Sequence, residues 1–404
     1  MTGPAPAAVA APVIKNISTG ATYTSLASAV SAVRSGEILE LLESATYVSE
    51  NVTIAVGNVT LRAASGMTPT LDGNYKDYCL RVGANGVRVS GITFVNGDTY
   101  GIKVENASDT ALDNLRLNGW FKDNGLYAEN AVRLQVSSVS FENCGGAGIY
   151  IKSSPNISLS GATATRIASA GCKYALQIES CTGAALSSLN VGTNWSDVIL
   201  ITNSSDTQLT NATVTGGEKG IRIENSPNTA MRSCTLSDTW DSMVYVKNSN
   251  GCTFDGGSVM TADIGFDLAG SQNMSILNCT LSTSTGSIGI KAVDSPGVSI
   301  RRCTVSGFLS SAIYTKNSSG LDARNTTIRE TGIGVNLDDN SHNAAIVNNT
   351  IAHNQSSGVF IASGCSNVVI KNNIITSNAW DYWKWGIQCQ STDHPGLSIT
   401  YNNV

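Results

Sequence analysis

Charge of either sign, aromatic rings and long apolar runs are all scarce in this chain of 404 residues. Charged residues make up 14% of the chain and aromatic residues 6%. No cluster of lysine and arginine occurs and the formal net charge is -5, which excludes a nucleic-acid partner that would require a basic surface. No stretch approaches the roughly 18 to 20 apolar residues that a membrane-spanning helix needs. We therefore expect no nucleic-acid partner and no membrane span.

Motifs for metals and cofactors are missing as well. No two cysteines have the C-x-x-C spacing that is typical of zinc and redox sites, and the 3 histidines are dispersed. Residues 1–15 contain small residues and proline but neither a basic start nor an apolar stretch, so they predict a flexible N-terminal tail rather than a secretion signal. We expect neither a metal site nor a cofactor.

A repeat of about 23 residues runs from Tyr78 to the end of the sequence. Its best copies are GIRIENSPNTAMRSCTL from Gly220, GFDLAGSQNMSILNCTL from Gly265 and GIKAVDSPGVSIRRCTV from Gly289, which place apolar residues at matching offsets. Short strands of period two alternate with turns of Asn, Ser, Pro and Gly. One such coil cannot bury its apolar face alone, but coils stacked about 4.8 Å apart can. The repeats predict an all-β, right-handed parallel β-helix of about fourteen coils.

The segment 16–77 is predicted to cap this β-helix, with repeats filling 78–404 in the same single domain, 16–404. A short helix is expected to carry Leu26, Val30 and Val33 on its buried face, with Thr24 as N-cap and Gly36 ending it. Such a helix would cover the first coil and hide its unpaired backbone edge.

The repeats resemble the right-handed parallel β-helix family, which includes pectate lyases, polysaccharide epimerases and many prokaryotic surface proteins. The opening segments ATYTSLASAVSAV, GEILELLESATY and ENVTI are most similar to repeat proteins of archaeal cell surfaces, including surface-layer and sheath components of methanogens. The resemblance implies an extracellular location at the cell surface or envelope. It specifies the fold well and the function poorly.

The 10 cysteines fall into two groups when the repeats are aligned. Apolar columns contain six, which are expected to face the interior: Cys79, Cys234, Cys252, Cys279, Cys303 and Cys389. Turns contain four, where a thiol has less reason to be buried: Cys144, Cys172, Cys181 and Cys365. These four are candidates for disulfide cross-links between coils or between molecules.

Outward strand positions carry charged and tyrosine side chains that could serve an enzyme as acid and base. They include Lys103, Glu105, Tyr127, Glu129, Tyr150, Lys152, Gln177, Glu179, Arg222, Glu224, Tyr245, Lys247, Lys291, Tyr314, Lys316 and Asp338. Glu129, Lys152 and Glu179 alternate in sign, which is how a solvated face avoids like-charge repulsion. Asp338 and Asp339 are adjacent in a predicted strand and should point to opposite faces. We therefore expect no catalytic residues.

The segment AWDYWKWG is the most unusual local sequence, with Trp380, Tyr382, Trp383 and Trp385 in an enlarged turn. Its rings either shield the last coils or form an interface. The final coil, ending at Val404, is expected to expose a strand edge that copies of the same chain could cover. These residues are the candidates for assembly.

Sequons of the form N-x-S/T are frequent, and the glycosylation candidates are Asn106, Asn156, Asn203, Asn211 and Asn317. A composition rich in Asn, Ser and Thr also produces such motifs through turn chemistry, so both explanations stay open.

Two functions are compatible with the sequence. The leading hypothesis is a non-enzymatic structural protein that assembles with copies of itself into an extracellular layer or sheath. The alternative is a polysaccharide lyase or epimerase, or a carbohydrate-binding module, with a cell-surface polysaccharide as partner. Ordered sheets or tubes of purified protein would favour the first hypothesis.

Overall fold

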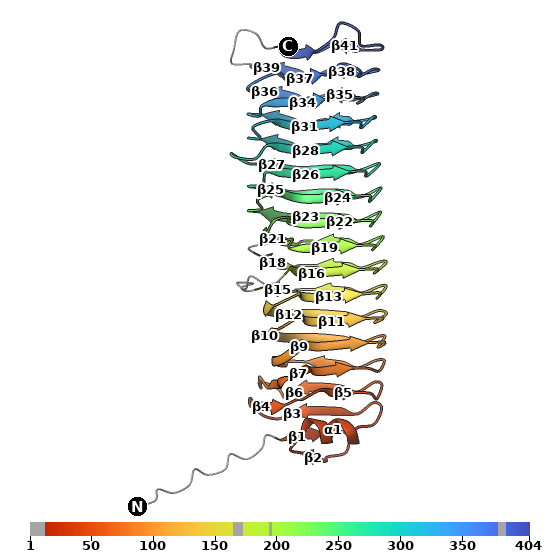
Figure 1. Ribbon diagram of the computed structural model, residues 1–404, viewed down its shortest axis with the longest axis vertical. Coiled ribbons are helices and arrows are strands. Elements are labelled where there is room, and N and C mark those ends of the chain that lie inside the picture. The colour runs from red at the N-terminus through yellow and green to blue at the C-terminus, as the bar shows by residue number, and fades with distance from the viewer. Residues whose placement is uncertain (1–12, 165–172, 194–195, 379–384) are drawn as a thin grey trace, which may run out of the picture. The chain divides into compact units, whose positions relative to one another are not determined.

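Stacked coils of parallel strands form this protein, as a computed structural model shows for residues 13–164, 173–193, 196–378 and 385–404 (Figure 1). The fold is an all-β right-handed parallel β-solenoid of about 14 turns with one short helix, so the predicted fold class is confirmed. Two compact units, Met1–Ser154 and Pro155–Val404, are described separately. The single domain 16–404 stays a prediction.

The first unit contains α1 and the strands β1 to β13. Their bounds are α1 (Leu26–Ala32), β1 (Ile14–Asn16), β2 (Thr22–Tyr23), β3 (Ile38–Leu41), β4 (Thr46–Val48), β5 (Val52–Ile54), β6 (Thr60–Ala63), β7 (Thr70–Val82), β8 (Arg88–Ser90), β9 (Thr93–Glu105), β10 (Ala111–Phe121), β11 (Asn124–Glu129), β12 (Gln135–Cys144) and β13 (Ala147–Lys152).

The second unit contains the strands β14 to β41. Their bounds are β14 (Ser158–Ser160), β15 (Thr163–Ala164), β16 (Tyr174–Glu179), β17 (Ala185–Ser187), β18 (Asn190–Thr193), β19 (Ile199–Thr202), β20 (Gln208–Thr210), β21 (Thr213–Gly216), β22 (Ile221–Glu224), β23 (Ala230–Ser237), β24 (Ser242–Lys247), β25 (Thr253–Met260), β26 (Ile264–Ala269), β27 (Ser275–Ser282), β28 (Ile288–Val293), β29 (Ser299–Arg301), β30 (Thr304–Ser306), β31 (Ser311–Lys316), β32 (Asp322–Arg324), β33 (Thr327–Arg329), β34 (Ile333–Leu337), β35 (Ala345–Val347), β36 (Thr350–Ala352), β37 (Val359–Ile361), β38 (Val369–Lys371), β39 (Ile374–Thr376), β40 (Ile387–Cys389) and β41 (Ser398–Thr400).

Each coil contributes strands to three faces, here named A, B and C. In the second unit, face A includes β19, β22, β24, β26, β28 and β31, face B includes β20, β29 and β32, and face C includes β21, β30 and β33. The longer strands β23, β25 and β27 pass from face B into face C. Residues such as Ile223, Leu236 and Ile300 point inward from the three faces and are almost wholly buried.

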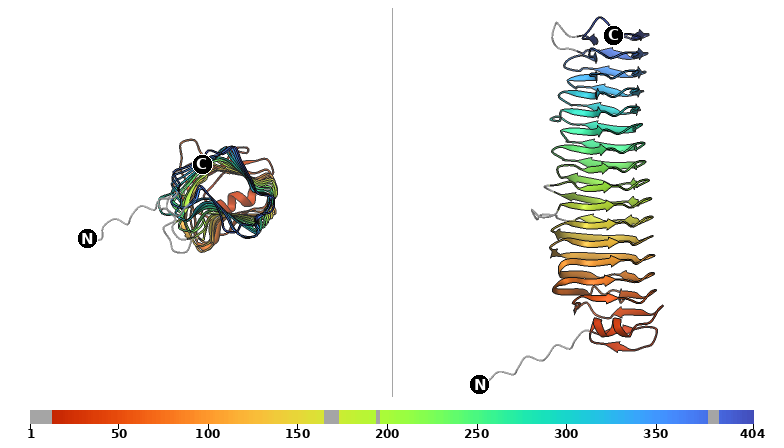
Figure 2. Two further views of the ribbon diagram at one scale, coloured as in Figure 1. Left: turned by 90° about the horizontal axis from the view of Figure 1, so that it is seen from above. Right: turned by 45° about the vertical axis from the view of Figure 1, so that its right-hand side comes forward.

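The first coil is covered by a strand as well as by the predicted helix. β1 pairs antiparallel with β3 and so occupies its backbone edge, while α1 packs against β1, β2 and β5 (Figure 2). Ser25, not Thr24, is the N-cap, because its side-chain oxygen accepts a hydrogen bond from the N–H of Ser28 at 3.2 Å. The helix ends at Ala32.

A serine ladder runs through the turns that connect face A to face B in the second unit. The N–H of Ser204 donates to Oγ of Ser226, and the N–H of Ser226 donates to Oγ of Ser249, both at 2.9 Å. The residue before each of these serines has a positive φ, as at Asn225 with 49°. Asparagine tolerates this conformation better than most residues, so the recurring Asn-Ser dipeptide aims the serine inward.

An asparagine ladder replaces buried apolar contacts where face B turns into face C near the end of the second unit. The N–H of Thr326 donates to Oδ1 of Asn349 at 2.9 Å, and the N–H of Asn349 donates to Oδ1 of Asn373 at 2.8 Å. Nδ2 of Asn349 also donates to the carbonyl oxygen of Ala323 at 2.9 Å. Buried backbone groups that face a turn are thus satisfied by side chains.

The coils differ in their number of residues, and much of this difference lies in the turn from face C to face A. Successive ladder serines are 22, 23 or 24 residues apart. The turn from face C to face A joins Met260 to Ile264 in one coil and Ser282 to Ile288 in the next. The serine ladder keeps its register across these coils because the added residues lie in that turn.

Candidate functional site

Face A of the second unit carries an outward column of polar and aromatic side chains. Strand register places these residues one above another: Leu200, Arg222, Tyr245, Asp267, Lys291 and Tyr314. Their neighbours along the strand, such as Ile221 and Ile223, are fully buried. The period-two alternation therefore supplies both the apolar interior and the outward column, as the sequence predicts.

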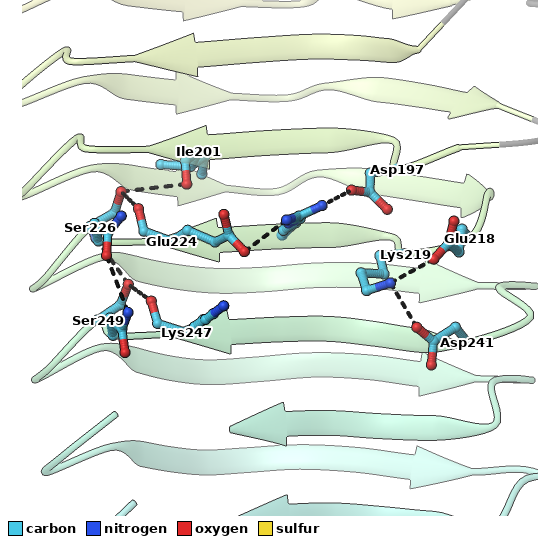
Figure 3. Close-up of polar contacts among 12 residues, drawn as sticks. Asp197, Ile201, Glu218, Lys219, Glu224, Ser226, Asp241, Lys247 and Ser249 are labelled. Carbon is cyan, nitrogen blue, oxygen red and sulfur yellow. Dashed lines mark hydrogen bonds and ion pairs between the residues drawn. The ribbon is translucent and has the colours of Figure 1, made fainter. Parts of the chain in front are cut away.

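Arg222 in β22 joins two carboxylates from different coils (Figure 3). Its Nη1 lies 3.2 Å from Oδ2 of Asp197, and its Nη2 lies 2.8 Å from Oε1 of Glu224. Asp197 precedes β19, and its side chain is only 8% exposed. Hydrogen bonds between charged partners are stronger than neutral ones, so the guanidinium holds both carboxylates in place.

Lys219 forms a second centre in the turn that leads into β22. Its Nζ lies 2.8 Å from Oε1 of Glu218 and 2.7 Å from Oδ2 of Asp241 (Figure 3). The same atom lies 5.7 Å from the ring centroid of Tyr245, a distance at which an ammonium is attracted to an aromatic ring. The Lys219 side chain is 13% exposed, so its charge is largely screened from water by these partners.

The electrostatics of this cluster raise the pKa of one carboxyl and of the lysine beside it, for different reasons. Burial raises the pKa of Asp197 above its ordinary value, although Arg222 and Lys219 lower it. Burial, and then the charge of Asp197, raise the pKa of Tyr174. Burial disfavours the ammonium of Lys219, but hydrogen bonds to its two carboxylate partners raise its pKa to about 12.

The paired strands β9, β11 and β13 of the first unit carry a tyrosine ladder. The rings of Tyr100 and Tyr127 have centroids 5.3 Å apart, and those of Tyr127 and Tyr150 are 5.5 Å apart. Nζ of Lys103 lies 5.1 Å from the centroid of the Tyr100 ring. The Tyr127 hydroxyl donates to Oε2 of Glu129 at 2.7 Å. Burial, followed by nearby carboxylates, raises the pKa of Tyr100 to about 12, so the phenols stay protonated.

The predicted alternation of charge along the outward columns is confirmed for one pair, since Nζ of Lys152 lies 3.7 Å from Oε1 of Glu129. Sequence reasoning missed Asp197, Lys219 and Asp241, because they lie in turns rather than at strand positions. A usable signal exists, since a charged residue stands two positions before the first residue of the apolar strand in SDVILI and in EKGIRI.

Asp338 and Asp339 do not face opposite sides. β34 ends at Leu337, and alternation applies only inside a strand. Nζ of Lys316 lies 3.7 Å from Oδ2 of Asp338 and 3.3 Å from Oδ2 of Asp339, so one cation contacts both. Burial would raise the pKa of Asp338, but hydrogen bonds from Tyr314 and Lys316 hold it below its ordinary value. This pair is a shared partner for one lysine rather than an acid and a base set on opposite sides of a substrate.

The expectation that turn cysteines are poorly buried is wrong. Cys144, Cys181 and Cys365 are buried, with at most 1% of their surface exposed. The N–H of Cys181 donates to Oγ of Ser204 at 2.9 Å, so this cysteine takes a serine position in the ladder. Sγ of Cys365 contacts the carbonyl oxygen of Leu337 on the preceding coil. Cys144 pairs with the buried Phe121 of the neighbouring strand β10. Cys172 lies outside the described residues.

Cross-linking between molecules by these four cysteines stays a prediction, and the burial of three of them argues against it. Of the cysteines expected inside, five are buried as predicted: Cys79, Cys234, Cys252, Cys279 and Cys303. Cys389 is exposed instead. It pairs with Ile361 on one side, and within the described part of the chain no strand pairs with β40 on the other.

Only two of the five residues proposed for assembly lie in the part of the chain that the structure describes. Trp380, Tyr382 and Trp383 lie outside the described residues, whereas Trp385 is 64% exposed and Val404 is 67% exposed. Self-assembly, a surface layer or sheath, and an extracellular location stay predictions. Electron microscopy of purified protein tests them, since ordered sheets or tubes are expected.

The glycosylation candidates all sit in turns with a positive φ and an exposed side chain: Asn106, Asn156, Asn203, Asn211 and Asn317. Nδ2 of Asn130 donates to Oδ1 of Asn106 at 3.1 Å, and Nδ2 of Asn340 donates to Oδ1 of Asn317 at 3.0 Å. Turn chemistry therefore accounts for these asparagines, and their glycosylation stays a prediction.

Two further features are limited to the described ranges 13–164, 173–193, 196–378 and 385–404. Within them, no group of three or more His, Cys, Asp or Glu side chains is placed to hold a metal ion. The helix there is too short to cross a membrane.

Comparison with known proteins identifies the fold. The model of the right handed beta helix region matches residues 45–182, 78–229, 174–294 and 244–404. The A-module of a mannuronan C-5 epimerase from Azotobacter vinelandii is similar, with a TM-score of 0.50 and 14% identity over 93% of this chain and 91% of that one. The enzymatically active domain of tailspike protein 2 from bacteriophage CBA120 has a TM-score of 0.50 and 12% identity over 68% of this chain.

The chain spans 48% of the length of that tailspike structure. No curated protein matches the sequence. The narrower resemblance to archaeal surface proteins stays a prediction. Since the family model matches successive, overlapping stretches from residue 45 to residue 404, the chain belongs to the right-handed β-helix family.

Proposed function

We propose that this protein binds a polysaccharide along face A, with the cluster around Arg222 and Lys219 as the anchor. The observation that carries the proposal is this outward-facing network, in which two cations and four carboxylates are fixed beside Tyr245. Sugar hydroxyls donate to carboxylates and accept from guanidinium and ammonium groups, while aromatic rings pack against sugar rings. The similar fold of a mannuronan C-5 epimerase supports a carbohydrate ligand.

The charge of the cluster favours a neutral polysaccharide over a polyanion. Each cation contacts two carboxylates: Lys219 contacts Glu218 and Asp241, and Arg222 contacts Asp197 and Glu224. Carboxylates therefore outnumber these cations, and an anionic chain would meet repulsion there. A hydroxyl-rich neutral chain would not.

Lys219→Met is expected to weaken binding of a neutral polysaccharide at least about tenfold, because hydrogen bonds to charged groups contribute about 1.5–3 kcal/mol. Methionine keeps an apolar side chain of similar length beside Tyr245. Affinity electrophoresis in gels containing neutral or acidic polysaccharides measures the effect. Arg301→Met, which removes an ion-paired cation from face B, is the matched control and should bind normally. Equal mobility of both variants in every gel would refute the proposal.

A second candidate function is cleavage of the bound polysaccharide, which belongs to the alternative that the sequence left open, although no catalytic residues were expected. The specific observation that favours it is Asp197, a carboxyl that is almost buried, has a raised pKa and is held by Arg222. A protonated carboxyl in such a place can donate its proton to a leaving glycosidic oxygen.

Cleavage by this route would depend on pH in one direction. The pKa of Asp197 is raised, so the acid form persists above the ordinary range and is lost as pH rises through that raised value. Activity should therefore fall with rising pH on that limb, and Asp197→Asn should reduce it at least about 100-fold. New reducing ends provide the assay. Undiminished cleavage by Asp197→Asn would exclude this role while leaving the binding proposal intact.

A further inference from the structure

Cys279 and Cys303 occupy the same interior position on consecutive coils. Leu277 pairs with Arg301 and Thr280 pairs with Thr304, so the strand register places the two cysteines opposite each other. Neighbouring strands lie about 4.8 Å apart, which falls within the range of about 4.4–6.8 Å between Cα atoms that a disulfide spans. The backbone thus already meets the first geometric requirement for a bond between the two sulfurs.

This pairing is peculiar to these two residues among the cysteines that the structure describes. Cys234 stands in the same column, but it pairs with Gly257, which in turn pairs with Cys279. Gly257 has no side chain and a φ of +106°, and a Cβ there would lie 2.1 Å from the carbonyl oxygen of Cys234. The glycine therefore separates Cys234 from the pair by a full coil.

The thiol of Cys303 leans toward the coil that carries Cys279. Its Sγ lies 3.5 Å from the carbonyl oxygen of Ile276, a residue of that coil, and 3.4 Å from that of Arg301. Sγ of Cys279 lies 3.1 Å from the carbonyl oxygen of Leu277. The two cysteines are 5% and 2% exposed. A second folded chain cannot reach them, so any bond formed there is internal, and a small oxidant reaches them when the coils open locally.

We propose that Cys279 and Cys303 form a reversible disulfide that links two consecutive coils, with a small-molecule disulfide as oxidant. The thiolate of one cysteine attacks a sulfur of the oxidant and expels one small thiolate. The other cysteine attacks the resulting mixed disulfide at the protein sulfur and expels the second. The two cysteines lose two electrons, the oxidant gains two, and the two thiol protons end on the small thiols.

The order of attack follows from the contact between the thiols. Their mutual hydrogen bond raises the pKa of Cys279, which burial raises further, and lowers the pKa of Cys303. Cys303 therefore ionises first and is the attacking sulfur. Cys279 also borders a small cavity on the side of the preceding coils, which it shares with Cys234 and Gly257, so the link to Cys234 is the competing outcome that the experiment must detect.

Incubating the purified full chain with oxidised glutathione, followed by tryptic digestion and mass spectrometry, tests the proposal. Trypsin cuts after lysine and arginine, so it leaves Cys303 in the peptide 303–316 and Cys279 in the peptide 248–291. The second peptide also holds Cys252, so the experiment uses Cys252→Ser protein. We expect the two peptides linked, a loss of the link in dithiothreitol, and a thermal midpoint raised by roughly 5 °C in the oxidised protein.

Variants and an internal standard make the outcome decisive. Cys279→Ser and Cys303→Ser should each abolish the link and the thermal shift, whereas Cys234→Ser should keep both. Exposed Cys389 should form a mixed disulfide with glutathione, which shows that the oxidant is active. Unlinked Cys279 and Cys303 in protein whose Cys389 is modified would overturn the proposal, as would a link from Cys279 to Cys234.

Discussion

Leu268→Asp is expected to unfold the coils around β26. Leu268 is 0% exposed at the centre of face A, so the substitution removes apolar packing and places a charge among Val246, Ala292 and other interior side chains. The packing loss alone is about 2–5 kcal/mol, and an unpaired buried carboxylate adds several more. Urea unfolding followed by circular dichroism should show a loss of at least about 5 kcal/mol, or no folded protein at all.

The neighbouring substitution Ala269→Asp is the matched control for charge. Ala269 points outward and pairs with Lys247 on the preceding coil, so the new carboxylate would be solvated beside a cation. Its free energy of unfolding should change by less than about 0.5 kcal/mol. If the two variants were equally stable, the strand register would be wrong by one residue, because such a slip exchanges the two faces.

Asn349→Leu should lower the free energy of unfolding by about 2–5 kcal/mol. Leucine has a similar size, but it cannot accept from the N–H of Thr326 or donate to the carbonyl oxygen of Ala323. Each buried polar group left without that partner costs about 1–3 kcal/mol. Urea titration of the variant beside the unchanged protein measures the loss.

Asn348→Gly provides the comparison for this ladder. Asn348 is exposed with a φ of 59°, which glycine adopts readily, so its replacement should alter stability by no more than about 0.5 kcal/mol. A loss below about 1 kcal/mol for Asn349→Leu would show that the asparagine ladder is dispensable.

The coil architecture was predictable because one physical constraint repeats. Every coil must bury the same strand positions, so Ile223, Leu268 and Ile290 can be placed inward by comparing copies of the repeat. The cap was harder, because it occurs once. Thr24 and Ser25 are both acceptable N-caps, and the pairing of β1 with β3 joins segments that no periodicity connects.

The candidate site was predictable only where it lies on strands. The outward positions of Arg222 and Tyr245 can be predicted from the alternation of side chains along a strand. Asp197 instead contacts Arg222 from a turn in the preceding coil. The repeat period does not predict the conformation of such a turn. Cys181 was misplaced for a related reason. The residue that precedes Cys181 has a positive φ, and this backbone conformation turns the cysteine side chain inward. The same conformation precedes each serine of the ladder.

The uneven coil length of the second unit has a consequence for protein engineering. The turn from face C to face A takes up added residues while the serine ladder keeps its register, so it behaves as a natural insertion point. It also lies directly before the strands of face A, where Asp197, Lys219 and Asp241 stand. A library of inserted loops at this turn would change what surrounds the charged cluster while leaving the scaffold untouched.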